Sequence, residues 1–393
     1  MPLKILISAG EASGDLYAAN LAAALRRRMP DVDLFGCTGP RMQAAGVRTV
    51  VDASSLAVVG VFEVISHIPR IYGEYRKLVR AARDERPDLA ILTDSPDFHL
   101  RLARRLKRMG VPVIYLVAPQ VWAWRKGRLP KMRRVIDRLL CIFPFEEAFF
   151  REHGVPATYI GHPLATLVRP SLTRQEFCAK HGLATDRPLV ALLPGSRHGE
   201  AARHMPALAD AAQRIARVLR VTFVLARPAG RFIGAGEQEF TDFKERIPGS
   251  TIQIIAGDTW NVLAHADVAL AASGTVTVEA AVLATPMVTF YKVTPLSWLL
   301  GKLLVDVPFY SMVNLVAGRA VVPELMQNEM SGGRLATEAL RLLNDPAARG
   351  EMRRDLQEVA RALAGFDDPI ERAAGIVDEF LATGNRRQPS NRM

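Results

Sequence analysis

An acidic side chain follows one of the apolar runs of this sequence, at the point where a buried strand would end. Asp94 comes directly after the run Leu89–Thr93, and open α/β sheets bind ligands at the carboxyl ends of their strands. Partial burial there would raise the pKa of a carboxyl group, and a neighbouring cation would lower it. We interpret Asp94 as a candidate general base, with turn stabilisation as the alternative. Asp97 is interpreted as the N-cap of the helix that follows.

Small residues follow the first apolar run of the chain. The segment Ala9–Asp15 contains Glu11, Ser13, Gly14 and Asp15. Glycine permits close approach of a backbone, and free N–H groups at a helix start favour an anionic or polar ligand. Turn formation alone explains the same residues equally well. The segment has neither the G-x-G-x-x-G spacing of dinucleotide sites nor a P-loop lysine, which argues against both of those functions.

Two tryptophans and a basic cluster come after another predicted strand. Trp122 and Trp124 are followed by Arg125, Lys126 and Arg128. Such a group can stack on a sugar ring and hold a phosphate. The alternative is a pair of core aromatic residues beside a solvated, basic helix start. Both interpretations stay open on the residues alone.

A basic loop stands in the second half of the chain, between an apolar run and a predicted helix. Gly195, Ser196 and Arg197 follow the run Leu189–Leu193. The N–H groups of a helix start, together with the rigid donor fork of an arginine, can bind a diphosphate without a metal ion. We therefore expect a diphosphate-binding loop at Arg197.

A companion loop of Ser273, Gly274 and Thr275 precedes another predicted helix. Glu279 lies four residues after Thr275 on the same helix face. Its carboxylate can accept hydrogen bonds from the hydroxyls of a ribose, and a solvated helix-surface glutamate is the alternative. Asn314, further along, can donate to a phosphate or a sugar hydroxyl, or it forms a turn.

These segments lie at the ends of apolar runs that alternate with longer helical patterns. The runs that predict strands are Lys4–Ser8, Leu34–Thr38, Leu89–Thr93, Val113–Val117, Leu139–Phe143 and Thr158–Ile160, then Leu189–Leu193, Thr222–Ala226, Thr251–Ile255, Val268–Ala271 and Met287–Tyr291. Alternation of this kind predicts βαβ units with parallel sheets buried on both faces. The predicted fold class is α/β, with two Rossmann-like, doubly wound domains that face each other across a cleft.

Helices are predicted between the strands and at the end of the chain. Their apolar residues recur at three- and four-residue spacing in Leu16–Arg28, Leu100–Met109, Phe145–His153, Met352–Ala364 and Ile370–Leu381. We expect a first domain over residues 1–167 and a second over 168–364. A helix over 365–382 should pack back on the first domain, and residues 383–393 should form a disordered tail.

The composition restricts the class of protein. Hydrophobic residues make up 49% of the 393 residues and charged residues 23%, which is typical of a globular chain. Cys37, Cys141 and Cys178 lie far apart and suggest neither a disulfide nor a zinc site, so we expect a reducing, cytoplasmic compartment. The sequence has no leader pattern and no uninterrupted apolar run of about 18 residues, and it predicts neither export nor a membrane span.

The net charge and two apolar segments bear on the partners. A formal charge of +11 favours partners that carry phosphate, such as a nucleotide or an anionic membrane surface. Segments 56–72 and 295–309 combine apolar and basic residues, which suits a membrane interface, although burial in the core or in a homodimer contact explains them equally. Binding of nucleic acid rests on charge alone and is not expected, because Trp122 and Trp124 share one loop.

Seven motifs, taken in order, resemble those of the lipid-A-disaccharide synthase family. They are Gly10–Asp15, Gly39–Met42, Asp94–Phe98, Val121–Arg125, Leu193–Arg197, Ser273–Thr275 and Asn314–Leu315. Each is modest alone, but the ordered set is specific. Segments 118–120 and 311–313 depart from the versions in that family, so the details of acceptor contact do not carry over from the resemblance at these two places.

The resemblance implies a cytosolic, peripheral-membrane glycosyltransferase of the GT-B type that needs no metal ion or other cofactor. It implies transfer from UDP-2,3-diacylglucosamine to 2,3-diacylglucosamine 1-phosphate (lipid X) at the inner-membrane surface, with inversion and release of UDP. By the same resemblance Asp94 is the essential aspartate, and Arg197, Glu279 and Asn314 belong to the UDP site. Other UDP-sugar enzymes of this fold, such as UDP-N-acetylglucosamine 2-epimerases and the transferase that makes lipid II, have motif sets that the sequence lacks.

Overall fold

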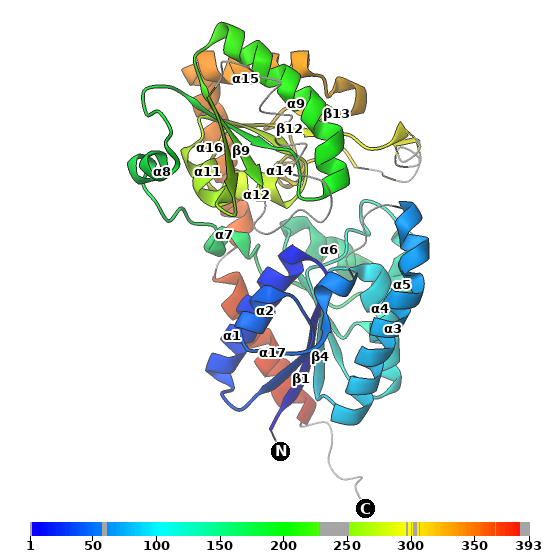
Figure 1. Cartoon of the computed structure of the whole chain (residues 1–393). Helices are drawn as coiled ribbons and strands as arrows, with labels where there is room; N and C mark the ends of the chain where they lie inside the picture. The colour runs from blue at the N-terminus through cyan, green and yellow to red at the C-terminus, as the bar shows by residue number, and fades with distance from the viewer. Residues whose placement is uncertain are drawn as a thin grey trace, which may run out of the picture. The chain divides into compact units, whose positions relative to one another are not determined.

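The computed structural model describes residues 2–56, 61–227, 251–295, 298–299, 301, 305, 307–365 and 367–385. The chain divides into two compact units. The first unit comprises residues 1–163 and 363–393, and the second comprises residues 164–362. Each unit is built on one parallel sheet with helices packed against it (Figure 1).

The sheet of the first unit has seven strands in the order β3-β2-β1-β4-β5-β6-β7. The strands are β1 (Lys4–Ala9), β2 (Asp33–Thr38), β3 (Arg48–Asp52), β4 (Leu89–Thr93), β5 (Val113–Leu116), β6 (Arg138–Cys141) and β7 (Ala157–Tyr159). The helices are α1 (Ala12–Arg28), α2 (Pro40–Ala44), α3 (Val61–Glu85), α4 (Pro96–Arg108), α5 (Leu129–Val135), α6 (Pro144–Glu152) and α17 (Pro369–Asn385), with short 3₁₀ turns η1 (Ala53–Leu56) and η2 (Lys126–Arg128). Helix α17 packs on α1, whereas α3 and α5 both pack on α4.

The sheet of the second unit has six parallel strands in the order β10-β9-β8-β11-β12-β13. The strands are β8 (Leu189–Leu193), β9 (Thr222–Arg227), β10 (Thr251–Ala256), β11 (Val268–Ala272), β12 (Met287–Tyr291) and β13 (Glu324–Met326). The helices are α7 (Leu164–Leu167), α8 (Arg174–His181), α9 (His198–Val218), α11 (Thr259–His265), α12 (Thr275–Val282), α14 (Met312–Ala317), α15 (Gly332–Asn344) and α16 (Pro346–Ala364), with the 3₁₀ turn η3 (Gln327–Glu329).

The strand order of each sheet reverses at one point. In the first unit the chain runs outward from β1 through β2 to β3, and then continues on the other side of β1 with β4. In the second unit the reversal falls between β8 and β11. Ligands of open α/β sheets bind beyond the carboxyl ends of the strands at such a reversal, so these two positions are the natural sites of the two units.

The central strands hold the core of each unit. Every residue of β4, β8 and β11 is buried, as an apolar run covered by helices on both faces requires. The prediction of two doubly wound α/β units is therefore confirmed.

Some predicted details differ from the structure. Strands β3 and β13 were not predicted, because β3 is a half-exposed edge strand without an apolar run and β13 has only three residues. Helix α1 begins at Ala12, ahead of the predicted Leu16. The small residues before Leu16 carry no apolar pattern, so the sequence did not show that they belong to the helix. Helix α17 continues to Asn385, so residues 383–385 of the predicted tail are helical, and residues 386–393 lie outside the described residues. The apolar segments 56–72 and 295–309 also lie partly outside them.

Candidate active site

The carboxylate of Asp94 lies where the first sheet reverses. Asp94 follows β4, and the loop after β1 folds onto its carboxylate. The N–H of Gly10 donates to Oδ1 at 2.9 Å, and the N–H of Glu11 donates to Oδ2 at 3.1 Å. The Asp94 side chain is 12% exposed. It is therefore fixed from one side while part of its surface remains open to a ligand.

Two glycines make room for this carboxylate. A Cβ atom at Gly14 would stand 1.7 Å from Oδ2 of Asp94, and one at Gly10 would stand 2.3 Å from Oγ of Ser95. Neither distance is tolerable for a side chain, and neither glycine has the positive φ that would otherwise explain its choice. The sequence predicted that glycine in this loop permits a close approach of the backbone. In the structure the group that the backbone approaches is Asp94 of the same chain.

The local environment changes the acidity of Asp94. The pKa of its carboxyl group is raised from 3.8 to about 7, mainly by burial and in part by the nearby Glu11 carboxylate. The Ser95 hydroxyl and the N–H groups of Glu11 and Gly10 act in the opposite direction. A carboxyl group with a pKa close to neutral pH is suited to accept a proton during a reaction.

The other predicted residues of the segment after β1 differ in their surroundings. Asp15 is buried and has a structural role, whereas Glu11 and Ser13 are at least partly exposed. Asp15 is 4% exposed, and its carboxylate accepts from the N–H groups of Gly39, Arg41 and Met42 at 2.9 to 3.1 Å. It therefore caps α2, so that of the two roles the sequence left open for this segment the structure shows the structural one at Asp15, and ligand contact there stays a prediction. Glu11 is exposed and Ser13 is half-buried.

The two tryptophans have different environments. Trp122 is buried; its indole N–H donates to Oε1 of Glu146 at 3.0 Å, and its ring meets Phe145 edge to face. Trp122 is thus a core residue in this structure, which is one of the two roles that the sequence left open, and stacking on a sugar stays a prediction. Trp124 is 38% exposed, and the guanidinium of Arg125 lies 4.2 Å from its ring centre.

Asp97 is not the helix cap that the sequence suggested. Ser95 precedes α4 as its N-cap residue with a left-handed backbone, and Asp97 lies inside the first helical turn. There its side chain is 72% exposed and pairs with Arg125 at 3.1 Å and with Arg128. These cations lower the pKa of Asp97, against the effect of its partial burial, so it stays ionised.

Arg197 lies where the second sheet reverses, in the loop between β8 and α9. Its side chain is 59% exposed and pairs with Oε1 of Glu200 at 3.0 Å. The hydroxyl of Tyr291, at the end of β12, donates to the same oxygen at 2.8 Å. A Cβ at Gly195, which has φ 116°, would lie 3.1 Å from Glu200. Glu200 and Tyr291 stabilise this loop through their hydrogen bonds, while Ser196 and Arg197 are exposed.

The companion loop follows β11, next to β8 in the same sheet. Gly274 and Thr275 are exposed, and Ser273 is half-buried and donates from Oγ to the carbonyl of Tyr310 at 3.2 Å. Helix α12 begins at Thr275, and Glu279 lies on it half-buried. Because β8 and β11 are neighbours, the loops after them, which contain Arg197 and Thr275, lie on the two sides of the same reversal.

Asn314 has no hydrogen-bonding capacity left for a ligand. It is 1% exposed, and its Nδ2 donates to the carbonyl of Val322 and to Glu324, at 2.9 and 2.8 Å. Its Oδ1 accepts from the N–H groups of Val321 and Val322, at 2.8 and 3.0 Å. An amide side chain offers two donors and two acceptor positions, so all four are used. In this structure Asn314 stabilises a loop, which is the alternative that the sequence left open, and its contact with a phosphate or a sugar stays a prediction.

Several residues that shape these sites were not singled out from the sequence. Ser8, His99 and Tyr115 are buried directly behind Asp94, and Tyr291 supports the loop of Arg197. The available signal was a polar residue inside an otherwise apolar strand, as at Ser8 and Tyr115. Such residues are buried only with a hydrogen-bond partner, which a sequence does not identify.

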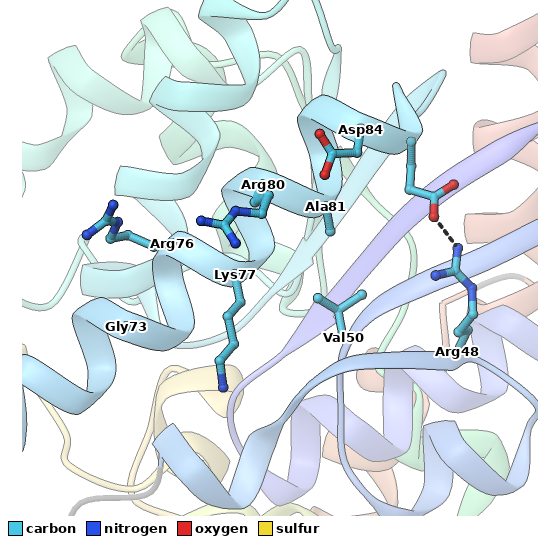
Figure 2. A pocket seen from close by; sticks show the side chains of 9 residues that line it. Arg48, Val50, Gly73, Arg76, Lys77, Arg80, Ala81 and Asp84 are labelled. Carbon is cyan, nitrogen blue, oxygen red and sulfur yellow. Dashed lines mark hydrogen bonds and ion pairs between the residues drawn. The ribbon is translucent and has the colours of Figure 1, made fainter.

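The first unit also has an open groove of about 570 Å³ between β3 and α3. Figure 2 shows the side chains of Arg76, Lys77 and Arg80 on α3, with Arg48 bound to an acidic residue at the other end of the groove. The groove contains none of the predicted site residues. Its lining is mainly basic, which makes it part of the surface charge of the unit.

The described part of the chain contains neither a metal-binding cluster nor a membrane-spanning helix. No three His, Cys, Asp or Glu side chains converge as a metal site among the residues that the structure describes. No helix in the same part of the chain is both long enough and apolar enough to cross a bilayer.

Comparisons with known proteins identify the family. A family model described as lipid-A-disaccharide synthetase matches residues 5–369. Lipid-A-disaccharide synthase of Solibacter usitatus (strain Ellin6076) is 65% identical over 378 residues, which cover 96% of this chain and 97% of that protein. Lipid-A-disaccharide synthase of Koribacter versatilis (strain Ellin345) is 44% identical over 376 residues, covering 95% and 97%.

Solved structures support the fold. The UDP-GlcNAc 2-epimerase of Neisseria meningitidis bound to UDP-GlcNAc has a TM-score of 0.65 at 12% identity, with 97% of this chain and 100% of that chain covered. At this identity the likeness concerns the fold alone, which is that of GT-B glycosyltransferases and related epimerases. The match of the family model over nearly the whole chain, together with relatives up to 65% identical, shows that the chain belongs to the lipid-A-disaccharide synthase family of glycosyltransferases.

Proposed function

We propose that this enzyme transfers a 2,3-diacylglucosamine unit from its UDP derivative to the 6-hydroxyl of 2,3-diacylglucosamine 1-phosphate. The products are UDP and the β-1,6-linked disaccharide 1-phosphate. The family supports the class of reaction. The observation that carries the proposed mechanism is the Asp94 carboxylate, which lies at the sheet reversal with its pKa raised to about 7.

In the proposed step, Asp94 removes the proton of the acceptor 6-hydroxyl as its oxygen attacks the anomeric carbon. The bond from the anomeric carbon to the UDP oxygen breaks at the same time, on the opposite face, so one displacement inverts the configuration. The proton ends on the Asp94 carboxyl group and the electron pair on the diphosphate. A partly exposed carboxylate with a near-neutral pKa is suited to this role, because a substantial fraction is ionised at neutral pH and that form is basic enough to hold the proton after the step.

The departing diphosphate gains negative charge, which we assign to the loops of the second unit. Arg197 offers an exposed guanidinium, and the helix starts of α9 and α12 offer backbone N–H groups. These groups can stabilise the charge without a cofactor, and we propose that no metal ion takes part. Glu200 pairs with Arg197, so a diphosphate would compete with Glu200 for this guanidinium.

Both proposed substrates carry acyl chains, and we further propose that the first unit meets the inner-membrane surface from the cytoplasm. Residues 96–135 contain eleven Lys and Arg against one acidic residue, so about a tenth of the chain holds +10 of the net charge of +11. These residues include α4 and α5, which pack together. The pKa of Lys131 on α5 is lowered, first by partial burial and then by the positive charge of arginines on α4. The cations of the two helices therefore lie close enough to repel one another. A bilayer with anionic lipids would relieve this repulsion.

Sedimentation with vesicles tests the membrane proposal. The variant R101Q/R104Q/R134Q should lose binding to vesicles that contain phosphatidylglycerol, whereas the control R217Q/R220Q/R353Q, with the same loss of charge in the second unit, should keep it. All six arginines are without an ion pair in the described structure. Equal binding by both variants would rule out the surface of α4 and α5.

The transfer reaction is tested with the two lipid substrates in detergent micelles. Mass spectrometry should find UDP and the disaccharide 1-phosphate, and an unchanged substrate mixture would contradict the proposed function. Asp94→Asn should lower kcat by about 10²- to 10⁴-fold, the usual contribution of a general base. UDP affinity by calorimetry should stay the same.

The matched control is Asp97→Asn, which removes a carboxylate three residues away that is 72% exposed. Its kcat should fall far less than that of Asp94→Asn. Near-normal turnover of Asp94→Asn would refute the assignment of the base without touching the assignment of the reaction.

A further inference from the structure

Three buried polar side chains lie behind the Asp94 backbone, and one of them, His99, also has Nδ1 3.9 Å from Oδ1 of the Asp94 carboxylate. Ser8 at the end of β1, His99 on α4 and Tyr115 on β5 are all 0% exposed. Nδ1 of His99 lies 3.0 Å from the carbonyl oxygen of Asp94, and the hydroxyl of Tyr115 donates to that same oxygen. Nε2 of His99 lies 2.8 Å from Oγ of Ser8. Two elements of the first unit, α4 and β5, thus contact one peptide group, and β1 contacts it only through the ring of His99.

The hydrogen positions in this cluster follow from the partners. A carbonyl oxygen only accepts, so Nδ1 of His99 must carry the proton that it shares with Asp94. The other ring nitrogen, Nε2, is then an acceptor, and Ser8 must donate to it. Burial lowers the pKa of His99 to about 4 and raises that of Tyr115 well above its usual value. Both donors therefore keep their protons in the same arrangement at neutral pH.

The backbone that these donors hold is unusual. Asp94 has φ 56° and Ser95 has φ 38°, and two consecutive non-glycine residues in the left-handed region are rare. A turn of this shape is easily built with glycine or asparagine at lower cost. Here an aspartate occupies it, and its side chain as a result meets the N–H groups of Gly10 and Glu11. The arrangement of the peptide decides where the carboxylate lies.

We propose that His99 and Tyr115 are positioning residues for Asp94, and that Ser8 fixes the ring of His99 in the tautomer that donates to the Asp94 carbonyl. This inference rests on the proposed role of Asp94 as the base. None of the three side chains touches a substrate in this scheme. They act through the peptide of Asp94, which they hold in the one conformation that places its carboxylate against the loop after β1.

The first test compares two substitutions of His99. His99→Asn keeps a donor, because Nδ2 of asparagine stands at the same number of bonds from the backbone as Nδ1 of histidine. His99→Leu removes the donor while it fills much of the volume. We expect His99→Leu to lower kcat at least tenfold, with the KM for the UDP-sugar within twofold of the original value. His99→Asn should recover kcat to within about threefold.

A second readout separates positioning from a merely structural role. If the Asp94 carboxylate leaves the N–H groups of Gly10 and Glu11 while it stays buried, it loses two interactions that lower its pKa. The midpoint of the acidic limb of the kcat/KM profile should therefore move to higher pH in His99→Leu and stay in place in His99→Asn. A structural role alone would lower Tm in both variants and leave this midpoint where it is.

Tyr115→Phe covers the case in which His99→Leu does not fold, because it removes a single hydroxyl group. It should lower kcat about three- to tenfold and move the acidic limb in the same direction. A folded His99→Leu or Tyr115→Phe protein with the original kcat and the original midpoint would overturn the inference. If Asp94→Asn is inactive at the same time, only this inference fails; if Asp94→Asn is active, the proposed base fails with it.

Discussion

The two sheets reverse in the same way, yet the two reversals are built differently. In the first unit the Asp94 carboxylate is 12% exposed and accepts hydrogen bonds from two backbone N–H groups. Glycines stand beside it, where a side chain would not fit. In the second unit Arg197 is 59% exposed, and a Cβ at Gly274 would meet nothing within 4 Å. One site is filled by its own chain, and the other is open.

This difference matches two kinds of chemical task. A group that moves a proton needs a fixed geometry and a tuned pKa, which require burial and donors that do not move. A group that binds a charged ligand needs exposed donors, which the ligand itself will bury. The same topology can therefore serve chemistry in one unit and binding in the other.

Among changes that leave Asp94 and Arg197 or their neighbours otherwise intact, the largest effect is expected from filling the space beside the Asp94 carboxylate. Gly14→Ala places a methyl group 1.7 Å from Oδ2 of Asp94, so the carboxylate must move by more than an ångström. Displacement of a reacting group by that distance costs about 10²-fold in rate, and we expect kcat to fall by that factor. Gly73→Ala, in the helix α3 with nothing within 4 Å of the new atom, is the control and should keep kcat. Equal kcat values for both variants would show that the tight site is not needed.

A smaller effect is expected in the open site. Arg197→Gln removes charge-assisted hydrogen bonds to a diphosphate, which contribute roughly 1.5–3 kcal/mol each, and exposure places the loss at the lower end. UDP affinity by calorimetry should fall about tenfold, while the pH dependence of kcat/KM stays unchanged. Arg214→Gln, further along α9 and paired with Asp210, serves as the control. A shift of the pH profile in Arg197→Gln would break the division of tasks between the units.

The smallest effect is on stability. The pKa of Asp94 is raised from 3.8 to about 7 in the folded protein. The folded state thus keeps a proton that the unfolded state releases, and this contribution to stability is complete below about pH 4 and lost as pH rises to about 7. Asp94→Asn is neutral throughout, so it should raise Tm by a few degrees above pH 7 and by less as the pH falls. Calorimetry between pH 4.5 and 8.5 measures this, and a gain independent of pH would contradict the raised pKa.

The sequence was sufficient for the fold class, because buried parallel strands are continuous apolar runs that need no tertiary information. It missed β3 and β13, whose residues are half-exposed at an edge or too few to form a pattern. The strand ends also located Asp94 and Arg197, since each follows a run directly. Whether these two side chains act as proposed stays a prediction.

The sequence was less informative about side chains whose roles depend on distant partners. Asp15 caps α2 from another helix, Trp122 reaches a buried glutamate on α6, and Asn314 closes a loop up to ten residues away. Each has a residue type that suits a ligand site equally well. Their hydrogen bonds depend on how the helices and strands pack, and the local sequence pattern does not indicate that packing.

The pKa of Asp94 in the folded enzyme is the most direct test of the account. Protein labelled with ¹³C at the side-chain carboxyl carbon of aspartate can be titrated by NMR, and the Asp94 signal identified by its loss in Asp94→Asn. We expect a midpoint at about pH 7, well separated from those of exposed aspartates. A midpoint near pH 4 would mean that the site does not tune its carboxylate for proton transfer.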